Sequence, residues 1–464
     1  MNKTENPLRT LAQYIVSIKI EELPAQVKQA AVHCLVDTVG AAIGGLDYDE
    51  VPEVIETFQA YSGHYCERDP RASVWGTHFN TSVFQASFLN GILSHALELD
   101  DVHTGSKTHI GAVVAPAAWS VAEAITASGA NLIEALVAGY ETMSRIGRGF
   151  GVSDHRLKGW HVSGTAGTFG AAAAAAKLLG LDAERTLAAL GMAGTQSSGV
   201  WAFLGDGATS KKLHTGRSAE NGVVAAFLAK AGMTGPEHIL DSEDGGLYRT
   251  MSGSSDLSEV SRKLGTVFEI LNVDKKPYSC CRSMHPAIDA ILSVKKELGL
   301  PASQIKKVKI RSYEVGIKQC GIIMYPANTS ESKFSMRFGV AVAYIDGLAG
   351  KEQFSTERIN DPEVRALAAR VDYIADSEFT SRYPKNWGCS LEVTIEDGSV
   401  IKKEVLDASG SVANPMTVEQ LKKKFKSLVS SFVGNERSEL ILKSLENMEN
   451  IPEVSDILSL HRGK

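Results

Sequence analysis

Hydrophobic side chains recur at helical spacing up to about residue 265. In the segment 7–18 they stand three or four positions apart, at Leu8, Leu11, Ile15 and Ile18. This period predicts a helix with one buried face. It also predicts a helix over 25–39, where Pro24 suits the entry into the first turn. Seven more helices are predicted over residues 52–61, 81–99, 112–127, 131–145, 164–180, 182–193 and 218–232. A loop over 62–76 with a short strand at 72–75 is expected before the helix 81–99.

The pattern changes in the second half of the chain. Residues 305–313 interleave apolar side chains with lysines, which predicts a strand. The segments 389–395 and 400–406 flank Asp397 and Gly398, a turn signal that predicts a β-hairpin. Four more helices are predicted over residues 334–348, 362–371, 417–432 and 436–448.

These elements predict a mainly α fold with two parts. Residues 1–267 and 407–464 are expected to form a large all-helical domain. Residues 268–406 are expected to form a smaller α+β lid domain inserted into it.

A polar segment, 94–116, interrupts this apolar helical pattern. Three histidines, three acids and one lysine stand between two apolar stretches: His95, Glu98, Asp100, Asp101, His103, Lys107 and His109. Ionisable groups between buried helices cost stability, so the segment is a candidate wall of an active site.

Three interpretations of this polar segment compete. His103, His109 and the adjacent acids are ligand types for a divalent metal, but their spacing matches no compact ligand motif. Histidine beside a carboxylate also suits metal-free acid–base chemistry, because imidazole titrates near neutral pH. The third interpretation is a helix end with solvated or paired charges, in which Asp100 only caps a helix.

Three further clusters bear candidate chemistry. His161 precedes a small-residue helix, where it can serve a site or simply cap the helix. The segments 210–217 and 275–285 concentrate positive charge in an acidic chain, which suits a site for a small anion or, equally, a solvated loop surface. No P-loop and no dinucleotide-binding glycine motif is present. The adjacent Cys280 and Cys281 are expected to pack rather than to react.

The composition narrows the class of protein. Of 464 residues, 44% are hydrophobic and 22% are charged, and the net charge is −6. Nucleic-acid and anionic-membrane surfaces need clustered Lys and Arg, so neither partner is expected. The six cysteines are too irregular for a disulfide framework or a zinc site. No secretion signal or run of 18 apolar residues is seen. We therefore expect a soluble cytoplasmic protein.

Several motifs, taken in order, resemble the MmgE/PrpD superfamily, which includes 2-methylcitrate dehydratase, cis-aconitate decarboxylase and iminodisuccinate epimerase. They are His95-Ala-Leu-Glu-Leu-Asp-Asp101, Thr108-His-Ile-Gly-Ala112 with Pro116, His161 before Gly-Thr-Ala-Gly-Thr-Phe-Gly, the segment 211–222, Thr234-Gly-Pro236, and Lys276-Pro-Tyr278 through His285. Glu98, Val102 and Cys320 depart from the decarboxylase-like pattern, which has Asp, Thr and a tyrosine there, and this argues against decarboxylation of cis-aconitate.

The resemblance implies a homodimer with a metal-free, cofactor-free site between the two domains. It places His109, His161, Lys211 and Lys276 in that site, and the epimerase-like pattern pairs Lys276 with Tyr140. We expect Lys276 to abstract the proton, with Tyr140 or His109 on the opposite side of the carbon. Lys211, Arg217 and Arg282 are cations that would bind carboxylates. The full expected set is Lys276, His109, Tyr140, His161 and Asp100 as catalytic residues, and Lys211, His103, Glu98, Arg217 and Arg282 as substrate-binding residues.

The functional hypothesis is a cofactor-free lyase or isomerase that abstracts a proton next to a carboxylate of a small di- or tricarboxylate. Dehydration, decarboxylation and epimerisation share this demand, and the sequence does not choose among them. A catalytically silent protein that binds a carboxylate is one alternative. A metal-dependent hydrolase is the other.

Overall fold

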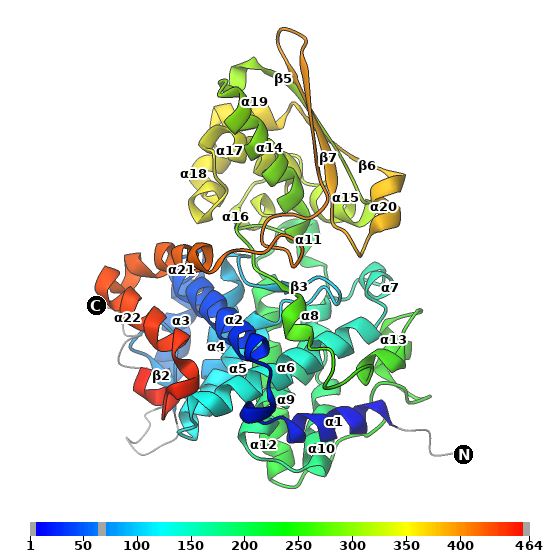
Figure 1. Ribbon diagram of the computed structural model, residues 1–464, viewed down its shortest axis with the longest axis vertical. Coiled ribbons are helices and arrows are strands. Elements are labelled where there is room, and N and C mark those ends of the chain that lie inside the picture. The colour runs from blue at the N-terminus through cyan, green and yellow to red at the C-terminus, as the bar shows by residue number, and fades with distance from the viewer. Residues whose placement is uncertain (1–5, 64–70, 458–464) are drawn as a thin grey trace.

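The computed structural model describes residues 6–63 and 71–457 (Figure 1). The chain is mainly helical, as predicted, with a small sheet in its C-terminal half. The helices before the sheet are α1 Pro7–Ser17, α2 Ala25–Gly44, α3 Val51–Tyr61, α4 Val83–Ala96, α5 Gly111–Ala124, α6 Gly129–Gly149, α7 Val152–Leu157, α8 Val162–Thr165, α9 Gly167–Leu178, α10 Ala183–Gly194, α11 Phe203–Asp206, α12 Lys211–Lys230 and α13 Leu247–Met251. Short strands β1 Ala72–Ser73, β2 Asn80–Thr81, β3 Val102–His103 and β4 Val273–Asp274 accompany them.

The second half contains the sheet, its helices and a helical tail. Its helices are α14 His285–Leu298, α15 Glu314–Cys320, α16 Thr329–Ser332, α17 Met336–Asp346, α18 Thr356–Ile359, α19 Pro362–Ala368 and α20 Ser377–Arg382, and the tail is α21 Val418–Val433 and α22 Asn435–Glu446. Strands β5 Ile305–Ser312, β6 Val371–Ala375, β7 Cys389–Ile395 and β8 Val400–Val405 form the sheet in the order β6-β5-β7-β8. Only β5 and β6 are parallel, and β7–β8 is the predicted hairpin.

The buried side chains form two hydrophobic cores. One combines side chains between Leu8 and Val273 with those of the tail helices. The other contains Phe203 and side chains between Cys280 and Ile395. In Figure 1 the sheet and its helices stand above the helical part, and the red tail returns to lie beside α2. The proposed domain boundaries at residues 268 and 406 stay a prediction.

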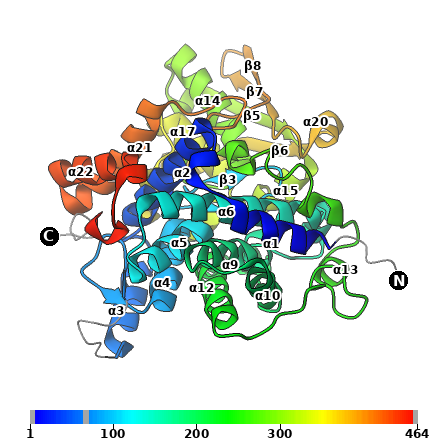
Figure 2. The same cartoon turned by 60° about the horizontal axis from the view of Figure 1, so that its bottom comes forward.

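Small residues allow the central helices to pack closely. α4, α5, α9 and α12 pack on one another, and Figure 2 shows them gathered in the helical part. A Cβ atom on Gly91 of α4 would lie 2.8 Å from Cα of Gly216 in α12. The backbones therefore touch, as the Gly- and Ala-rich composition of these helices predicts.

Some predicted elements differ from the structure. The helix expected from residue 218 begins at Lys211, because its first two turns are polar but buried against α4. The helix expected over 164–180 is divided into α8 and α9. Strand β6 lies where the end of a helix was expected. Part of the predicted loop 62–76, including Cys66, lies outside the described residues. Within 6–63 and 71–457, no helix is long and apolar enough to cross a bilayer.

Candidate active site

A cavity lies where residues of the two cores meet, with a volume of about 50 Å³. One wall comes from the polar segment 94–116 and from the region of α7 and α8. The opposite wall comes from the part of the chain that holds the sheet. Its lining is Glu98, Val102, Lys107, His109, Val152, His155, Arg156, Trp160, His161, Val162, Trp201, Lys211, Cys281, Arg282, Gln319 and Trp387.

The polar segment is held in an unusual backbone conformation. Helix α4 ends at Ala96, and Glu98 then adopts φ +53°, while Lys107 further on adopts φ +59°. Positive φ is costly for a side chain with a Cβ and persists where the surroundings enforce it, often at functional sites. The carboxylate of Asp101 accepts the Gly111 N–H at 2.8 Å and so satisfies the start of α5. Glu98 and Lys107, the two residues with positive φ, both line the cavity.

Two histidines share one buried carboxylate. His95 Nδ1 lies 2.9 Å from Asp100 Oδ1, and His109 Nδ1 lies 3.1 Å from Asp100 Oδ2. Asp100 is completely buried. Burial alone would raise the pKa of Asp100, but His95, His109 and Lys276 outweigh it and hold the pKa well below its usual range. Asp100 is therefore an ionised acceptor between the two rings.

The tautomer of His109 follows from its contacts. Its Nδ1 also lies 3.3 Å from the carbonyl oxygen of Asp101, which can only accept a hydrogen bond. Burial lowers the pKa of His109 to about 3, so the ring is neutral at pH 7. Nδ1 then carries the proton, and Nε2 is the acceptor of a ring that lines the cavity. The arrangement suits a group that takes a proton from a bound molecule.

Glu98 joins the histidines to two buried lysines. Its carboxylate forms an ion pair with Lys211 and lies 3.1 Å from His95 Nε2 and 3.5 Å from Lys276 Nζ. The Lys276 ammonium also donates to the Glu98 carbonyl oxygen at 2.5 Å. Burial would raise the pKa of Glu98, but these neighbours hold it well below its usual range. Glu98 is therefore a fixed negative charge between cations.

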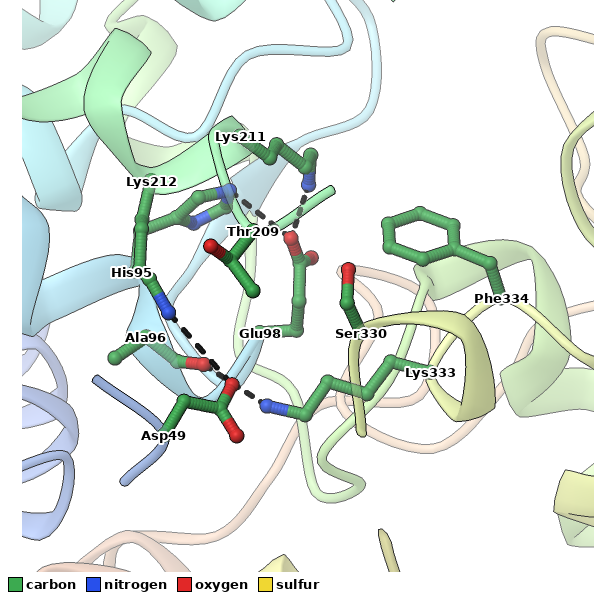
Figure 3. A pocket seen from close by; sticks show the side chains of 10 residues that line it. All are labelled: Asp49, His95, Ala96, Glu98, Thr209, Lys211, Lys212, Ser330, Lys333 and Phe334. Carbon is green, nitrogen blue, oxygen red and sulfur yellow. Dashed lines mark hydrogen bonds and ion pairs between the residues drawn. The ribbon is translucent and has the colours of Figure 1, made fainter. Parts of the chain in front are cut away.

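Figure 3 shows a smaller pocket on the other side of this ion pair, in which the Glu98 carboxylate points toward both His95 and Lys211. Lys333 donates to the Ala96 carbonyl oxygen at 2.9 Å there, and Lys212 lies 3.6 Å from Asp49. Burial lowers the pKa of Lys333 to about 7. The Glu98–Lys211 pair thus separates two polar spaces.

His161 stands on the cavity wall beside aromatic rings. Its Nδ1 lies 2.9 Å from Nδ1 of His214, and its ring is 5.4 Å from that of Trp201. Its ring centroid is 6.4 Å from that of His109. Burial and, to a lesser extent, the positive charge of Lys211 lower the pKa of His161 well below its usual value, so this ring is neutral as well.

The structure thus gathers seven of the ten predicted site residues around one cavity. His109, His161, Glu98, Lys211 and Arg282 line it, and Asp100 and Lys276 bond directly to lining residues. Arg282 is also paired with Asp274 at 3.0 Å. The roles assigned to these side chains remain predictions.

Three predicted residues lie elsewhere. Tyr140 is fully buried behind the cavity, where its hydroxyl donates to Asp101 Oδ2 at 2.6 Å. His103 is paired with Glu269 at 3.1 Å. Arg217 is half exposed on α12, where it pairs with Glu220. None of the three lines the cavity.

Sequence reasoning left Arg156, Trp201, Trp387 and Lys333 out of the site. Arg156 stands five residues before His161, and Lys107 stands inside the polar segment without having been assigned a role. Cys320, where the resemblance expects a tyrosine, is a buried free thiol that forms a hydrogen bond with the thiol of Cys281 on the cavity wall. A basic residue close to a candidate histidine was the available signal for Arg156.

One group in the site has metal-ligand chemistry. His95, Asp100 and His109 each offer one atom, and these atoms lie within 4.8 Å of one another. His95 Nδ1 and His109 Nδ1 also lie 2.9 and 3.1 Å from the two oxygens of Asp100. Asp100 Oδ2 forms no hydrogen bond among the described residues.

Comparison with known proteins supports the motif resemblance. Models of the MmgE/PrpD N-terminal and C-terminal domains match residues 9–260 and 278–450. The chain belongs to the MmgE/PrpD family. It is 28% identical to human cis-aconitate decarboxylase, over 98% of this chain and 94% of that protein. It is 26% identical to a cis-aconitate decarboxylase-like protein of Aspergillus oryzae, over 99% of this chain and 98% of that protein. It is 22% identical to mitochondrial 2-methylcitrate dehydratase of Yarrowia lipolytica, over 86% of this chain and 78% of that protein. This MmgE/PrpD chain therefore matches these lyases along most of its length.

Proposed function

We propose that this protein is a lyase that acts on a small tricarboxylate in the cavity between the two cores. The proposal rests first on the neutral His109 at the cavity wall, with Nδ1 held by Asp100 and Asp101. The names of the MmgE/PrpD relatives, a decarboxylase and a dehydratase, support a lyase of one of these two types. In this proposal the part of the chain with the sheet closes the site as a lid, and residues of the chain suffice without a cofactor.

The proposed chemistry creates negative charge on a carbon next to a carboxylate. In a dehydration, neutral His109 takes the proton at Nε2, and the hydroxyl leaves as water after it receives a proton from a lysine ammonium of the site. In a decarboxylation, CO2 leaves, and His109 that has first taken up a solvent proton at Nε2 delivers it to the carbon. Lys211 and Arg282 bind carboxylates of the substrate and, together with Lys276, stabilise the enolate-like charge. Glu98 holds Lys211 and Lys276 in place, because its carboxylate contacts both. His161 faces the same cavity and orients the substrate.

The direct test is turnover of tricarboxylates followed by NMR. Citrate, 2-methylcitrate and cis-aconitate are incubated with the purified protein in H2O and in D2O, and released CO2 is measured in parallel. Formation of an alkene without CO2 identifies a dehydratase, and CO2 release identifies a decarboxylase. Proton exchange with neither product identifies an isomerase and contradicts the lyase proposal.

Two substitutions test the proton-transferring group. His109→Gln is expected to lower kcat/KM by about 100-fold or more. Lys276→Met tests the alternative in which the lysine is the base, and full activity of this variant would exclude that role. Binding of all three acids without turnover would instead support a silent carboxylate-binding protein. Loss of activity on removal of a metal, restored by its return, would support the metal-dependent alternative.

The proposed assembly is a homodimer in solution. This follows only from the resemblance to the superfamily. Light scattering coupled to size-exclusion chromatography measures the mass directly. A mass near that of one 49.7 kDa chain would contradict the dimer.

A further inference from the structure

The cavity contains two kinds of cation. Lys211 is paired with Glu98, and Arg282 is paired with Asp274. Lys107 and Arg156 line the same cavity, but no carboxylate of residues 6–63 and 71–457 forms an ion pair with either. Glu98 is the only acid in the cavity lining, and it already lies against lysines. One part of the cavity therefore has positive charge without a protein counter-charge.

The two cations without a carboxylate partner, Lys107 and Arg156, repel each other. Burial lowers the pKa of Lys107 to about 7, and the neighbouring Arg156 lowers it further in the same direction. Burial also lowers the pKa of Arg156. Two like charges that are held together and partly removed from water destabilise the free protein. An anion placed between them removes both costs.

Rigid contacts fix these cations at the cavity wall. The Arg156 guanidinium lies 4.1 Å from the ring centre of Trp201, and Lys107 Nζ lies 4.3 Å from that of Tyr383. Lys107 has a weak hydrogen bond of 3.4 Å to Ser153, and its backbone adopts φ +59°. The Nε–H of Arg156 is buried and has no acceptor among the described residues. Buried donors are normally satisfied, and an anion bound beside Arg156 would supply the acceptor.

We propose that Lys107 and Arg156 form a second carboxylate-binding site in the cavity, separate from Lys211 and Arg282. A forked guanidinium and an ammonium together match a carboxylate, and Trp201 orients the guanidinium. This site rests on the proposed function, since it would take one carboxylate of the tricarboxylate substrate. It predicts a preference for acids with three carboxylates, because the cavity then offers enough cations for each of them.

The test measures binding of tricarballylate, an unreactive acid with three carboxylates, by titration calorimetry. Arg156→Met keeps an unbranched apolar side chain against Trp201 but removes the charge and the donors. It is expected to weaken tricarballylate binding by about 10- to 100-fold, the usual effect of losing charge-assisted hydrogen bonds. Arg156→Lys, which keeps the charge, is expected to lose less. Lys158→Met removes an exposed cation two residues away and is the control, with less than about a twofold change expected from a screened surface charge.

The melting temperature of the unliganded protein distinguishes this role from a structural one. Removing one of two unpaired, like-charged groups should leave the melting temperature of Arg156→Met unchanged or raise it. A clear drop in that temperature, together with weaker binding, would mean that Arg156 is structural and would overturn the site. Unchanged affinity in Arg156→Met, or no tricarballylate binding by the wild type, would overturn it as well.

Turnover in the NMR assay separates the failure of this site from the failure of the lyase. If Arg156→Met weakens tricarballylate binding but the wild type converts no acid, the carboxylate site is supported and the lyase proposal fails. If the wild type converts a tricarboxylate and Arg156→Met changes neither its KM nor tricarballylate affinity, the lyase proposal is supported and the second site fails.

Discussion

His109 Nδ1 lies 3.1 Å from Oδ2 of Asp100. The same carboxylate lies 2.9 Å from His95 through its other oxygen, so one buried charge orients two rings. His109 is on the cavity wall and Asp100 is not. We therefore propose that Asp100 positions His109, the proposed proton-transferring ring, and does not itself touch a substrate.

Asp100→Asn tests this positioning role. The substitution leaves one oxygen for two histidine rings and introduces an NH2 group that must face a ring nitrogen. Because His109 can then adopt the other tautomer, kcat/KM is expected to fall by about 100-fold, with a smaller change in KM. Steady-state kinetics on the tricarboxylate identified by NMR measures both. Asp244→Asn, at an exposed position, is the control, and equal activity of the two variants would contradict the role of Asp100.

The affinity for tricarballylate is expected to depend on pH through Lys107. The pKa of Lys107 is lowered from 10.5 to about 7, and only the protonated ammonium attracts a carboxylate. The protonated fraction falls as the pH rises through 7, so affinity should fall by about tenfold between pH 6 and pH 8. The groups that face Lys107 are Arg156, Ser153 and the ring of Tyr383.

Lys107→Arg isolates this effect from other groups that titrate in the same range. Arginine stays protonated, so the variant should bind with a nearly constant affinity over pH 6–8. Calorimetric titrations of both proteins at several pH values give the comparison. An equal pH dependence in the variant would assign the effect to another group.

Gly91→Ala is expected to destabilise the protein and to disturb the site. The new Cβ would meet the backbone of Gly216 at 2.8 Å, and a backbone cannot move aside as a flexible side chain can. Forced separation of α4 and α12 should cost about 1–3 kcal/mol in the free energy of unfolding. Activity should fall too, since α4 carries His95 and α12 begins with Lys211.

Gly205→Ala is the matched control for the helix-packing experiment. Gly205 is exposed, and a Cβ there would meet no atom within 4 Å. Urea unfolding and activity should both stay close to wild type. If Gly91→Ala were as stable as Gly205→Ala, the close approach of the two helices would not contribute to stability.

Hydrophobic period predicted most of the longer helices and the hairpin, but it missed α14 and the elements fixed by tertiary contacts. The first turns of α12 contain Lys211, Lys212 and His214, a polar run that predicts a loop, yet burial against α4 makes them helical. Strand β6 is a short edge strand that follows α19 after two residues, so its apolar residues continue the helical pattern. The local sequence does not show the packing of α12 on α4 or the pairing of β6 with β5, because both depend on distant parts of the chain.

The candidate site shows the same limit. The polar segment 94–116 identified one wall, because ionisable groups between apolar helices are conspicuous. Arg156 and Trp201 come from segments 40 or more residues after it, and only the fold brings them beside Lys107. The resemblance pairs Tyr140 with Lys276. In the structure the Tyr140 hydroxyl donates a hydrogen bond to Asp101.

Tyr140→Phe distinguishes a proton-transferring role from a positioning one. Its hydroxyl donates to Asp101, which is buried and whose pKa is raised to about 6, mainly by that burial. The hydrogen bond from Tyr140 favours the ionised carboxylate, so its removal should raise the pKa of Asp101 further. Activity near pH 7 should then fall by less than about tenfold and recover at pH 8, because a higher pH restores the ionised Asp101 carboxylate that accepts the Gly111 N–H at the start of α5. A proton-transferring Tyr140 predicts a loss of about 100-fold or more at every pH.

Tyr248→Phe, which removes a buried hydroxyl that donates to the Ile146 carbonyl oxygen at 3.0 Å, is the control for stability. Rates measured from pH 6 to pH 8.5 decide between the two roles, and a large loss that does not vary with pH would establish Tyr140 as the acid or base.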